Sequence, residues 1–300
     1  MADMTRTTTN EPGTRWDHCL DEWVPTDRGG RRWHDLFVAE VPGWRPLVAS
    51  LETPPGDGPH PLVIRIHGGG WMTGHPRAPS DLRRALRVPE TLLDAGYAVA
   101  DITYRLAGEG AFPMQIHDCA AGVRYFRHHA ARLGLDPDRF AAKGESAGGH
   151  MALLLGVDRP DPLEGTVGVT GPSSKVQCVV DWYGVADLMI PFRGRSLLER
   201  VADPDNAVGK LLGGPGATEE MARQASPVTH VTPASAPCLI QHGTEDSIVT
   251  FNHAEAMHDA LARAGVPVDL HAIEGAEHGF PGGDLAPIMP RVMAFLNRWL

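Results

Sequence analysis

The stretch Lys143–His150, with the sequence KGESAGGH, decides the fold. It contains Gly-x-Ser-x-Gly, follows the apolar run Arg139–Lys143 and precedes the helix-like run Met151–Leu155. A strand that turns sharply into a helix holds one residue in a strained conformation with its side chain exposed. Glycines two positions to either side are needed, because a Cβ there would collide with the neighbouring strand and helix. The stretch therefore predicts Ser146 as an exposed nucleophile, although an isolated match also fits an ordinary glycine-rich turn.

A second glycine-rich stretch, His67–Trp71 with the sequence HGGGW, follows the apolar run Leu62–Ile66. Consecutive glycines after a strand let the backbone turn with its N–H groups exposed, as in the oxyanion hole of enzymes with a Gly-x-Ser-x-Gly nucleophile. We expect the N–H groups of Gly68, Gly69 and Ala147 to bind the negatively charged oxygen of a tetrahedral intermediate. A flexible hairpin loop is the alternative, which the second independent motif disfavours.

An acidic residue and a histidine follow two later predicted strands. Asp246 comes after Pro237–His242, and His278 lies in a glycine-rich loop after Val268–Ile273. The chain order Ser, Asp, His is that of hydrolases with this type of nucleophile. His278 would take the serine proton and return it to the leaving group, and Asp246 would orient the imidazole. Neighbouring carboxylates that remain as alternatives for the acid are Glu245, Glu274 and Glu277.

The rest of the chain alternates short apolar runs with helical patterns. The predicted strands are His34–Val41, Pro46–Glu52, Leu62–His67, Tyr97–Tyr104, Arg139–Lys143, Val176–Tyr183, Pro237–His242 and Val268–Ile273. The main helical patterns are Pro113–Leu133, Asn252–Ala264 and Ile288–Leu300. This alternation predicts an α/β fold, with a mostly parallel sheet of about eight strands flanked by helices. The first two strands have no helix between them, so we expect an antiparallel hairpin at one edge.

Two segments do not fit the alternation. Residues 185–236 contain Pro and Gly clusters and one or two short helices, which indicates a small cap-like insertion. Residues 1–33 carry Trp16, Trp23 and Trp33, which suggests a segment that docks on the body and contributes to the cap. The alternative is that these tryptophans pack only among themselves. The main α/β domain is then expected over residues 34–300.

Composition excludes several classes of function. Gly and Pro, with 34 and 26 residues, make up one fifth of the 300 residues, and 42% of the residues are hydrophobic, which is enough to build a core. The net charge of −10 gives no electrostatic reason to bind nucleic acid or an anionic membrane surface. The four cysteines include no Cys-x-x-Cys pair and are interpreted as core thiols, with a disulfide left open. The sequence shows neither a signal peptide nor a membrane-spanning run, so a cytoplasmic location is expected.

In combination, these motifs resemble those of the α/β-hydrolase superfamily, and within it the His-Gly-Gly-Gly carboxylesterases similar to hormone-sensitive lipase. The resemblance covers roughly residues 61–300 and includes the stretches 101–106 (DITYRL), 115–118 (QIHD) and 181–187 (DWYGVAD). Residues 242–246 read His-Gly-x-x-Asp, as is frequent in acetyl-xylan and feruloyl esterase-like enzymes. The sequence departs from the usual pattern at Glu145, where Asp is common.

The resemblance implies hydrolysis of carboxylic esters by a Ser-His-Asp triad through an acyl-serine intermediate, with no metal and no organic cofactor. Short-to-medium acyl or aryl esters are expected, because no long apolar lid helix is visible. Trp71, Met72 and Phe280 flank the oxyanion loop and the base, so we expect them near the substrate, ordinary core packing being the alternative. The expected partner is a small-molecule ester, bound by a monomer or a homodimer.

Two other functions remain possible on this scaffold. One is an arylformamidase-like amide hydrolase, which would use the same triad and loop. The other is a non-catalytic receptor, although such proteins usually lose part of the triad. Of the 15 histidines, His67 is interpreted as support for the oxyanion loop and His150 as packing.

Overall fold

The computed structural model describes residues 17–76 and 81–300, and its centre is a nine-stranded sheet. The strands are β1 (Val24–Pro25), β2 (Arg31–Ala39), β3 (Leu47–Glu52), β4 (His60–Ile66), β5 (Ala98–Ile102), β6 (Leu135–Glu145), β7 (Cys178–Trp182), β8 (Cys238–Gly243) and β9 (Val268–Ile273). Their order in the sheet is β1-β2-β3-β5-β4-β6-β7-β8-β9. The pairs from β5 to β9 are parallel and those from β1 to β5 antiparallel, which confirms the predicted hairpin at one edge.

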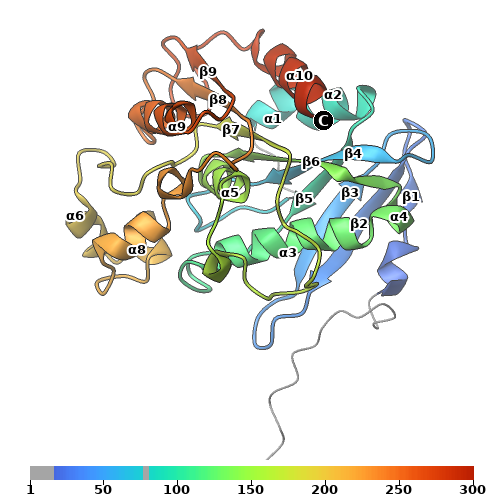
Figure 1. Cartoon of the computed structure of the whole chain (residues 1–300), viewed down its shortest axis with the longest axis horizontal. Helices are drawn as coiled ribbons and strands as arrows, with labels where there is room; N and C mark the ends of the chain where they lie inside the picture. Colours follow the sequence, from blue (N-terminus) through green and yellow to red (C-terminus); the bar gives the residue numbers. More distant parts are fainter. Residues whose placement is uncertain (1–16, 77–80) are drawn as a thin grey trace, which may run out of the picture.

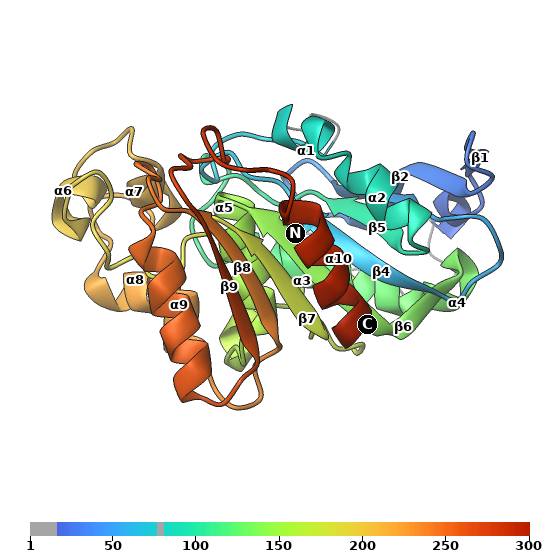
Figure 2. The same cartoon turned by 90° about the horizontal axis from the view of Figure 1, so that it is seen from above.

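Helices cover both faces of the sheet (Figures 1 and 2). The α-helices are α1 (Asp81–Ala85), α2 (Val88–Asp94), α3 (Met114–His128), α4 (Ala130–Leu133), α5 (Ala147–Gly156), α6 (Leu197–Val201), α7 (Ala207–Leu211), α8 (Glu219–Gln224), α9 (Asn252–Arg263) and α10 (Ile288–Trp299). Short 3-10 turns are η1 (Asp17–Leu20), η2 (Asp161–Leu163) and η3 (Pro227–His230). Apolar side chains of α3, α5 and α9 share one core cluster, and those of α2 and α10 share the other.

The two clusters explain why the central strands are almost continuously apolar. In β4, Leu62, Ile64 and Ile66 belong to the cluster under α3 and α5, whereas Val63 belongs to the cluster under α10. Successive side chains of a strand point to opposite faces, so a strand buried on both faces needs apolar residues at every position. The strands β4 to β9 run parallel to one another, so their carboxyl ends all lie at the same edge of the sheet.

The predicted insertion, residues 185–236, contains the three short helices α6, α7 and α8. In both views they lie at the opposite end of the molecule from β1 (Figures 1 and 2). The described part of the N-terminal segment, residues 17–33, lies instead at the β1 edge, where Trp33 is buried and donates its indole N–H to the Leu20 carbonyl over 2.9 Å. The remaining part, including Trp16, lies outside the described residues.

The cysteines and the lengths of the helices bear on two further expectations from the sequence. All four cysteines are free thiols, and Cys119, Cys178 and Cys238 are buried in the core. Among the described residues, none of the helices combines the length and apolar character required to cross a bilayer.

A buried ion pair fixes the chain that follows β5. The Arg105 side chain donates to both carboxylate oxygens of Asp118 over 2.7 and 2.8 Å, and its backbone N–H donates over 2.8 Å. The adjacent Tyr104 stacks on the His67 ring, with 4.4 Å between ring centroids, and donates its hydroxyl to the His67 carbonyl over 3.1 Å. The ion pair of Arg105 and Asp118 therefore holds the neighbouring Tyr104 in place, and Tyr104 supports the glycine loop that follows β4.

We expect Asp118→Ala to lower the free energy of unfolding by about 3–5 kcal/mol, because it leaves the Arg105 guanidinium buried without its counter-ion. Urea unfolding measures this loss. The exposed pair of Arg84 and Asp81 provides the control, since Arg84→Ala is expected to cost less than about 1 kcal/mol. Equal losses in the two variants would contradict a supporting role for the buried pair.

Candidate active site

Ser146 sits in the turn between β6 and α5 in a conformation that residues with a side chain rarely adopt. Its φ is 54° and its ψ is −121°, and its N–H donates to the Trp182 carbonyl over 2.9 Å. A Cβ on Gly144 would overlap the carbonyl of Gly148, and one on Gly148 would overlap the carbonyl of Ile66. The two glycines of the motif are thus required by the close approach of β4, β6 and α5, as predicted.

The structure brings the three predicted side chains into one line at the carboxyl ends of three strands of the sheet. His278 Nε2 lies 3.0 Å from Ser146 Oγ, and His278 Nδ1 lies 2.7 Å from Asp246 Oδ2. Ser146 follows β6, Asp246 follows β8 and His278 follows β9. Of the alternative carboxylates, Glu277 accepts hydrogen bonds from Ser247 instead.

The Asp246 carboxylate is fully buried but well supplied with donors. Its Oδ1 accepts from the N–H groups of Ile248 and Val249 over 2.9 and 2.8 Å, and its Oδ2 lies 3.3 Å from His242 Nε2. Burial opposes ionisation, yet the hydrogen bonds from His242 and His278 hold the pKa of Asp246 well below its usual range. From the sequence, His242 is only part of the His-Gly-x-x-Asp stretch and has no assigned role, although its position four residues before the acid places it beside the carboxylate at the end of β8.

Aromatic side chains pack beneath His278. The Tyr183 ring lies 4.7 Å from the His278 ring, and Phe280 lies 4.8 Å from Tyr183, both in edge contacts. Phe280 is 1% exposed and belongs to the core, so the prediction that it contacts substrate is not supported by its position. Phe280 packs on Tyr183, and Tyr183 packs on His278, so Phe280 supports the base indirectly. Tyr183 was not identified as a site residue from the sequence.

The glycine loop packs directly against the serine. An ideal Cβ on Gly68 would lie 2.9 Å from the Glu145 carbonyl oxygen and 3.4 Å from Ser146 Cβ. In the part of the chain that the structure describes, the N–H groups of Gly68 and Gly69 donate to no acceptor. Ala147 is the first residue of α5, so its N–H has no partner within the helix. All three expected oxyanion donors therefore stand near Ser146 with unused N–H groups.

Two buried neutral histidines hold this loop. His67 Nδ1 donates to the Gly68 carbonyl over 2.8 Å, and burial lowers the pKa of His67 to about 4. The Trp71 indole donates to His150 Nδ1 over 3.1 Å, while His150 Nε2 lies 2.6 Å from the Ala225 carbonyl. Burial also lowers the pKa of His150 to about 4, which suits a ring that accepts at one nitrogen and donates at the other. His67 thus supports the loop as the sequence indicated, whereas His150, which was expected to pack, also holds Trp71 by a hydrogen bond.

A charged network lies below the nucleophile. The Arg83 guanidinium on α1 donates to Glu145 over 2.6 Å. Burial acts against ionisation of Glu145, but Arg83 and Lys143 together lower its pKa. The departure at Glu145 from the usual Asp was the only sequence signal for this contact, because the longer side chain reaches α1.

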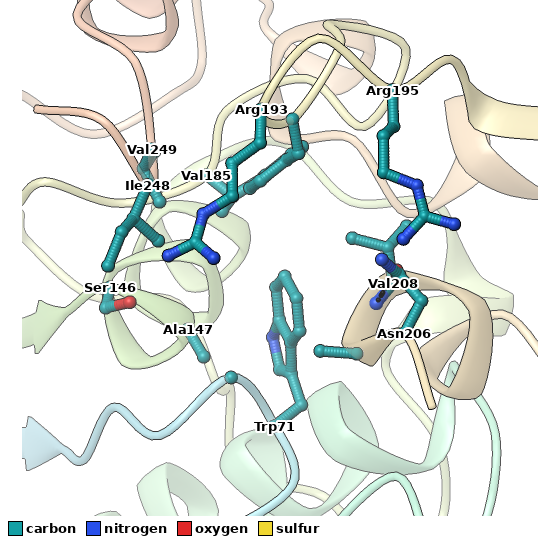
Figure 3. Close-up of a pocket in the computed structure, with 13 residues that line it drawn as sticks. Trp71, Ser146, Ala147, Val185, Arg193, Arg195, Asn206, Val208, Ile248 and Val249 are labelled. Atoms are coloured by element: carbon teal, nitrogen blue, oxygen red, sulfur yellow. Dashed lines mark hydrogen bonds between the residues drawn. The ribbon is translucent and has the colours of Figure 1, made fainter. Parts of the chain in front are cut away.

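Two cavities meet at Ser146. One, of about 730 Å³, is lined by the glycine loop, Glu145, Tyr183 and His278. The other, of about 260 Å³, is lined by Trp71, Ala147 and residues of the insertion (Figure 3). Met72 lies in neither lining and packs against the core, so of the three residues predicted to contact substrate only Trp71 lines either of these two cavities as the structure describes them. Within residues 17–76 and 81–300, no cluster of three or more His, Cys, Asp or Glu is arranged to hold a metal ion.

A family of known proteins and two curated relatives are similar to this chain in sequence. The BD-FAE family model matches residues 51–261. The chain is 28% identical over 234 residues to the "Probable carboxylic ester hydrolase LipM" of Mycobacterium tuberculosis, covering 74% of this chain and 50% of LipM. It is 29% identical over 249 residues to Esterase LipC of the same organism, covering 80% of this chain and 59% of LipC. The chain thus spans about half the length of these curated relatives.

The fold itself is shared with solved structures. A truncated carbohydrate esterase from gut microbiota superposes with a TM-score of 0.78 at 24% identity, covering 92% of this chain and 98% of the other. At this identity the likeness concerns the fold, which is the α/β-hydrolase fold that the sequence indicated.

The stability of the folded chain in acid should depend on Asp246. Because its pKa is lower when folded than the value of about 3.9 in an unfolded chain, its carboxylate stabilises the fold above that value. This stabilisation is lost as the pH falls below about 4 towards the lowered pKa. In urea unfolding, we expect the stability difference between wild type and Asp246→Asn to be largest at neutral pH and to shrink below about pH 4.

The control is Asp269→Asn, because Asp269 is exposed on β9. Its stability difference from wild type is expected to be small at every pH. A difference for Asp246→Asn that stayed constant into acid would contradict a stabilising carboxylate.

Proposed function

The chain belongs to the BD-FAE family, and on this premise we propose that it is a serine carboxylesterase that hydrolyses short-to-medium acyl or aryl esters. The observation that carries the proposal is the continuous hydrogen-bonded line from Ser146 Oγ through His278 to Asp246, over 3.0 and 2.7 Å. A serine hydroxyl is a weak nucleophile, so a base within hydrogen-bond reach is the minimum requirement for covalent catalysis.

In the first half of the reaction, Ser146 Oγ attacks the ester carbonyl carbon and its proton moves to His278 Nε2. The carbonyl oxygen becomes an oxyanion that the N–H groups of Gly68, Gly69 and Ala147 can stabilise. Such donors contribute about 10²–10³-fold each to the rate in comparable sites. When the tetrahedral intermediate collapses, the carbon–oxygen bond to the alcohol breaks and His278 gives the proton to the alcohol, leaving an acyl-serine.

In the second half, water replaces the alcohol. His278 takes a proton from the water as its oxygen attacks the acyl carbon, and the bond to Ser146 Oγ then breaks. The proton returns to the serine, and the carboxylic acid leaves. The buried Asp246 carboxylate favours each step that forms imidazolium, because it accepts the Nδ1–H and stabilises the positive charge.

The two cavities suggest where each half of the substrate binds. The leaving alcohol must receive its proton from His278, and His278 lines the cavity of about 730 Å³. The acyl group then extends to the other side of Ser146, into the cavity of about 260 Å³. A cavity of that size favours short acyl groups over long chains.

We expect Ser146→Ala to lower kcat for p-nitrophenyl acetate by at least about 10⁴-fold, because no other group can form the acyl intermediate. Circular dichroism and urea unfolding of the same variant should match wild type, since the hydroxyl is not needed by the turn. Activity close to wild type would refute Ser146 as the nucleophile.

The same protein should prefer esters to formamides. We expect kcat/KM for p-nitrophenyl acetate to exceed that for N-formylkynurenine, measured with both substrates on one preparation. Efficient turnover of the formamide alone would instead favour the arylformamidase-like function, and failure to turn over either substrate would favour a binding protein.

A further inference from the structure

The cavity that we assign to the acyl group is lined by positively charged side chains. Most of its wall is apolar and includes Trp71, Val185, Val208 and Ile248. Of the thirteen described residues that line it, two are arginines and none is acidic (Figure 3). The whole chain carries a net charge of −10, so a cationic lining beside the nucleophile runs against its overall electrostatic character.

Only one of the two arginines is already neutralised. Arg195 pairs with Asp203 over 2.8 Å and donates to the Glu199 carbonyl over 2.9 Å. Arg193, by contrast, forms no hydrogen bond or ion pair within the described residues. Figure 3 shows its guanidinium extending from its loop into the cavity, toward Ser146 and Trp71. The cavity therefore offers a free cation with several N–H donors close to the reacting serine.

The backbone under Arg193 is built as a tight turn. Phe192 and Arg195 form an antiparallel bridge, with the Arg195 N–H donating to the Phe192 carbonyl over 2.9 Å. The two residues between them, Arg193 and Gly194, have φ values of 49° and 71°. A two-residue turn with positive φ at both positions is of type I′, which favours Gly, Asn and Asp. Arginine is strained there, and strain of this kind tends to be retained where the side chain has a function.

The turn is anchored through Phe192, which also lines the cavity. The Phe192 ring lies 5.1 Å from the Arg200 guanidinium and 5.1 Å from the His253 ring. Arg200 is buried and also donates to the Leu188 carbonyl over 2.7 Å. These contacts fix one end of a four-residue turn within the connection between β7 and α6, so Arg193 is presented from a preorganised support.

A second donor group lies in the same lining. Asn206 uses its side-chain oxygen to cap α7, where it accepts from the N–H groups of Val208 and Gly209 over 3.0 and 3.2 Å. The oxygen is occupied, so the side chain can offer only its amide N–H groups to a ligand. Arg193 and Asn206 thus have side-chain N–H donors left for a ligand, which suits an acceptor with negative charge.

We propose that the cavity of about 260 Å³ selects acyl groups that end in a carboxylate, and that the preferred substrates are monoesters of short dicarboxylic acids, with Arg193 as the residue that determines this specificity. The inference rests on the proposed esterase function and specifies its substrate class. The apolar walls accommodate the methylene groups, and the guanidinium binds the terminal carboxylate through charge-assisted hydrogen bonds. A neutral acyl group of equal length cannot neutralise the guanidinium and forms at most an uncharged hydrogen bond with it.

The test compares substrates that differ only in charge. Monoethyl glutarate is paired with its neutral carboxamide isostere, ethyl 4-carbamoylbutanoate, and release of acid or ethanol gives kcat/KM for each. We expect the anionic ester to be preferred at least about tenfold, the scale of one charge-assisted hydrogen bond. O-acetylglycolate, with its own amide as the neutral partner, places the carboxylate on the alcohol instead.

Variants of Arg193 identify the source of the preference. Arg193→Gln should bring the ratio of anionic to neutral kcat/KM close to one, and Arg193→Lys should retain part of it, because lysine keeps the charge without the planar fork. Arg193→Gly should lower the ratio equally while keeping or raising Tm, since glycine suits the positive φ. Loss of preference in a fully folded variant separates specificity from damage to the fold.

The matched control is Arg223→Gln, because Arg223 is exposed on α8, pairs with Glu219 and lies outside the cavity. Its ratio should equal that of wild type. A wild-type ratio near one with neutral esters still hydrolysed, or a ratio unchanged in Arg193→Gln, would overturn this inference alone. Preference for O-acetylglycolate instead of glutarate would overturn the acyl-side placement, and failure to hydrolyse any ester would overturn the proposed function itself.

Discussion

The site depends on one close approach of backbone to backbone, where α5 begins against the end of β4. Gly148 lies so near the Ile66 carbonyl that no side chain fits between them, and this contact lets Ser146 keep its positive φ at the end of β6. Because β4 ends at the same place, the glycine loop that follows it packs on Ser146. The nucleophile and the N–H groups of Gly68 and Gly69 are therefore positioned by the same packing of sheet and helix.

The parts of the site that could be predicted are those that follow a strand directly. A strand end fixes the place of the next few residues, so the motifs around Ser146, Asp246 and His278 were enough to bring them to one edge. What could not be predicted are contacts made across the sheet, such as Arg83 with Glu145, which depend on how α1 packs. The same limit explains Met72 and Phe280, since proximity along the chain does not decide which way a side chain faces. The strand β1 was missed because two exposed residues carry no periodic pattern.

Histidines surround the nucleophile without adding charge to it. Burial lowers the pKa of His67 and His150 to about 4 and that of His253 to about 3, so these rings are neutral at physiological pH. The fixed charges near Ser146 include the Asp246 carboxylate, the buried pair of Arg83 and Glu145, and the guanidinium of Arg193. An acidic surface and a locally cationic cavity can coexist because low-dielectric walls make nearby charges dominate over distant ones.

His150 also joins the oxyanion loop to the helical insertion. One ring nitrogen holds Trp71 in the oxyanion loop, and the other holds the Ala225 carbonyl at the end of α8. An exchange of the helical insertion for another of different length would remove the second bond and free the ring that orients Trp71. The insertion is therefore not an independent module, and an insertion taken from a related enzyme would have to place a carbonyl where that of Ala225 lies to keep the His150 ring in position.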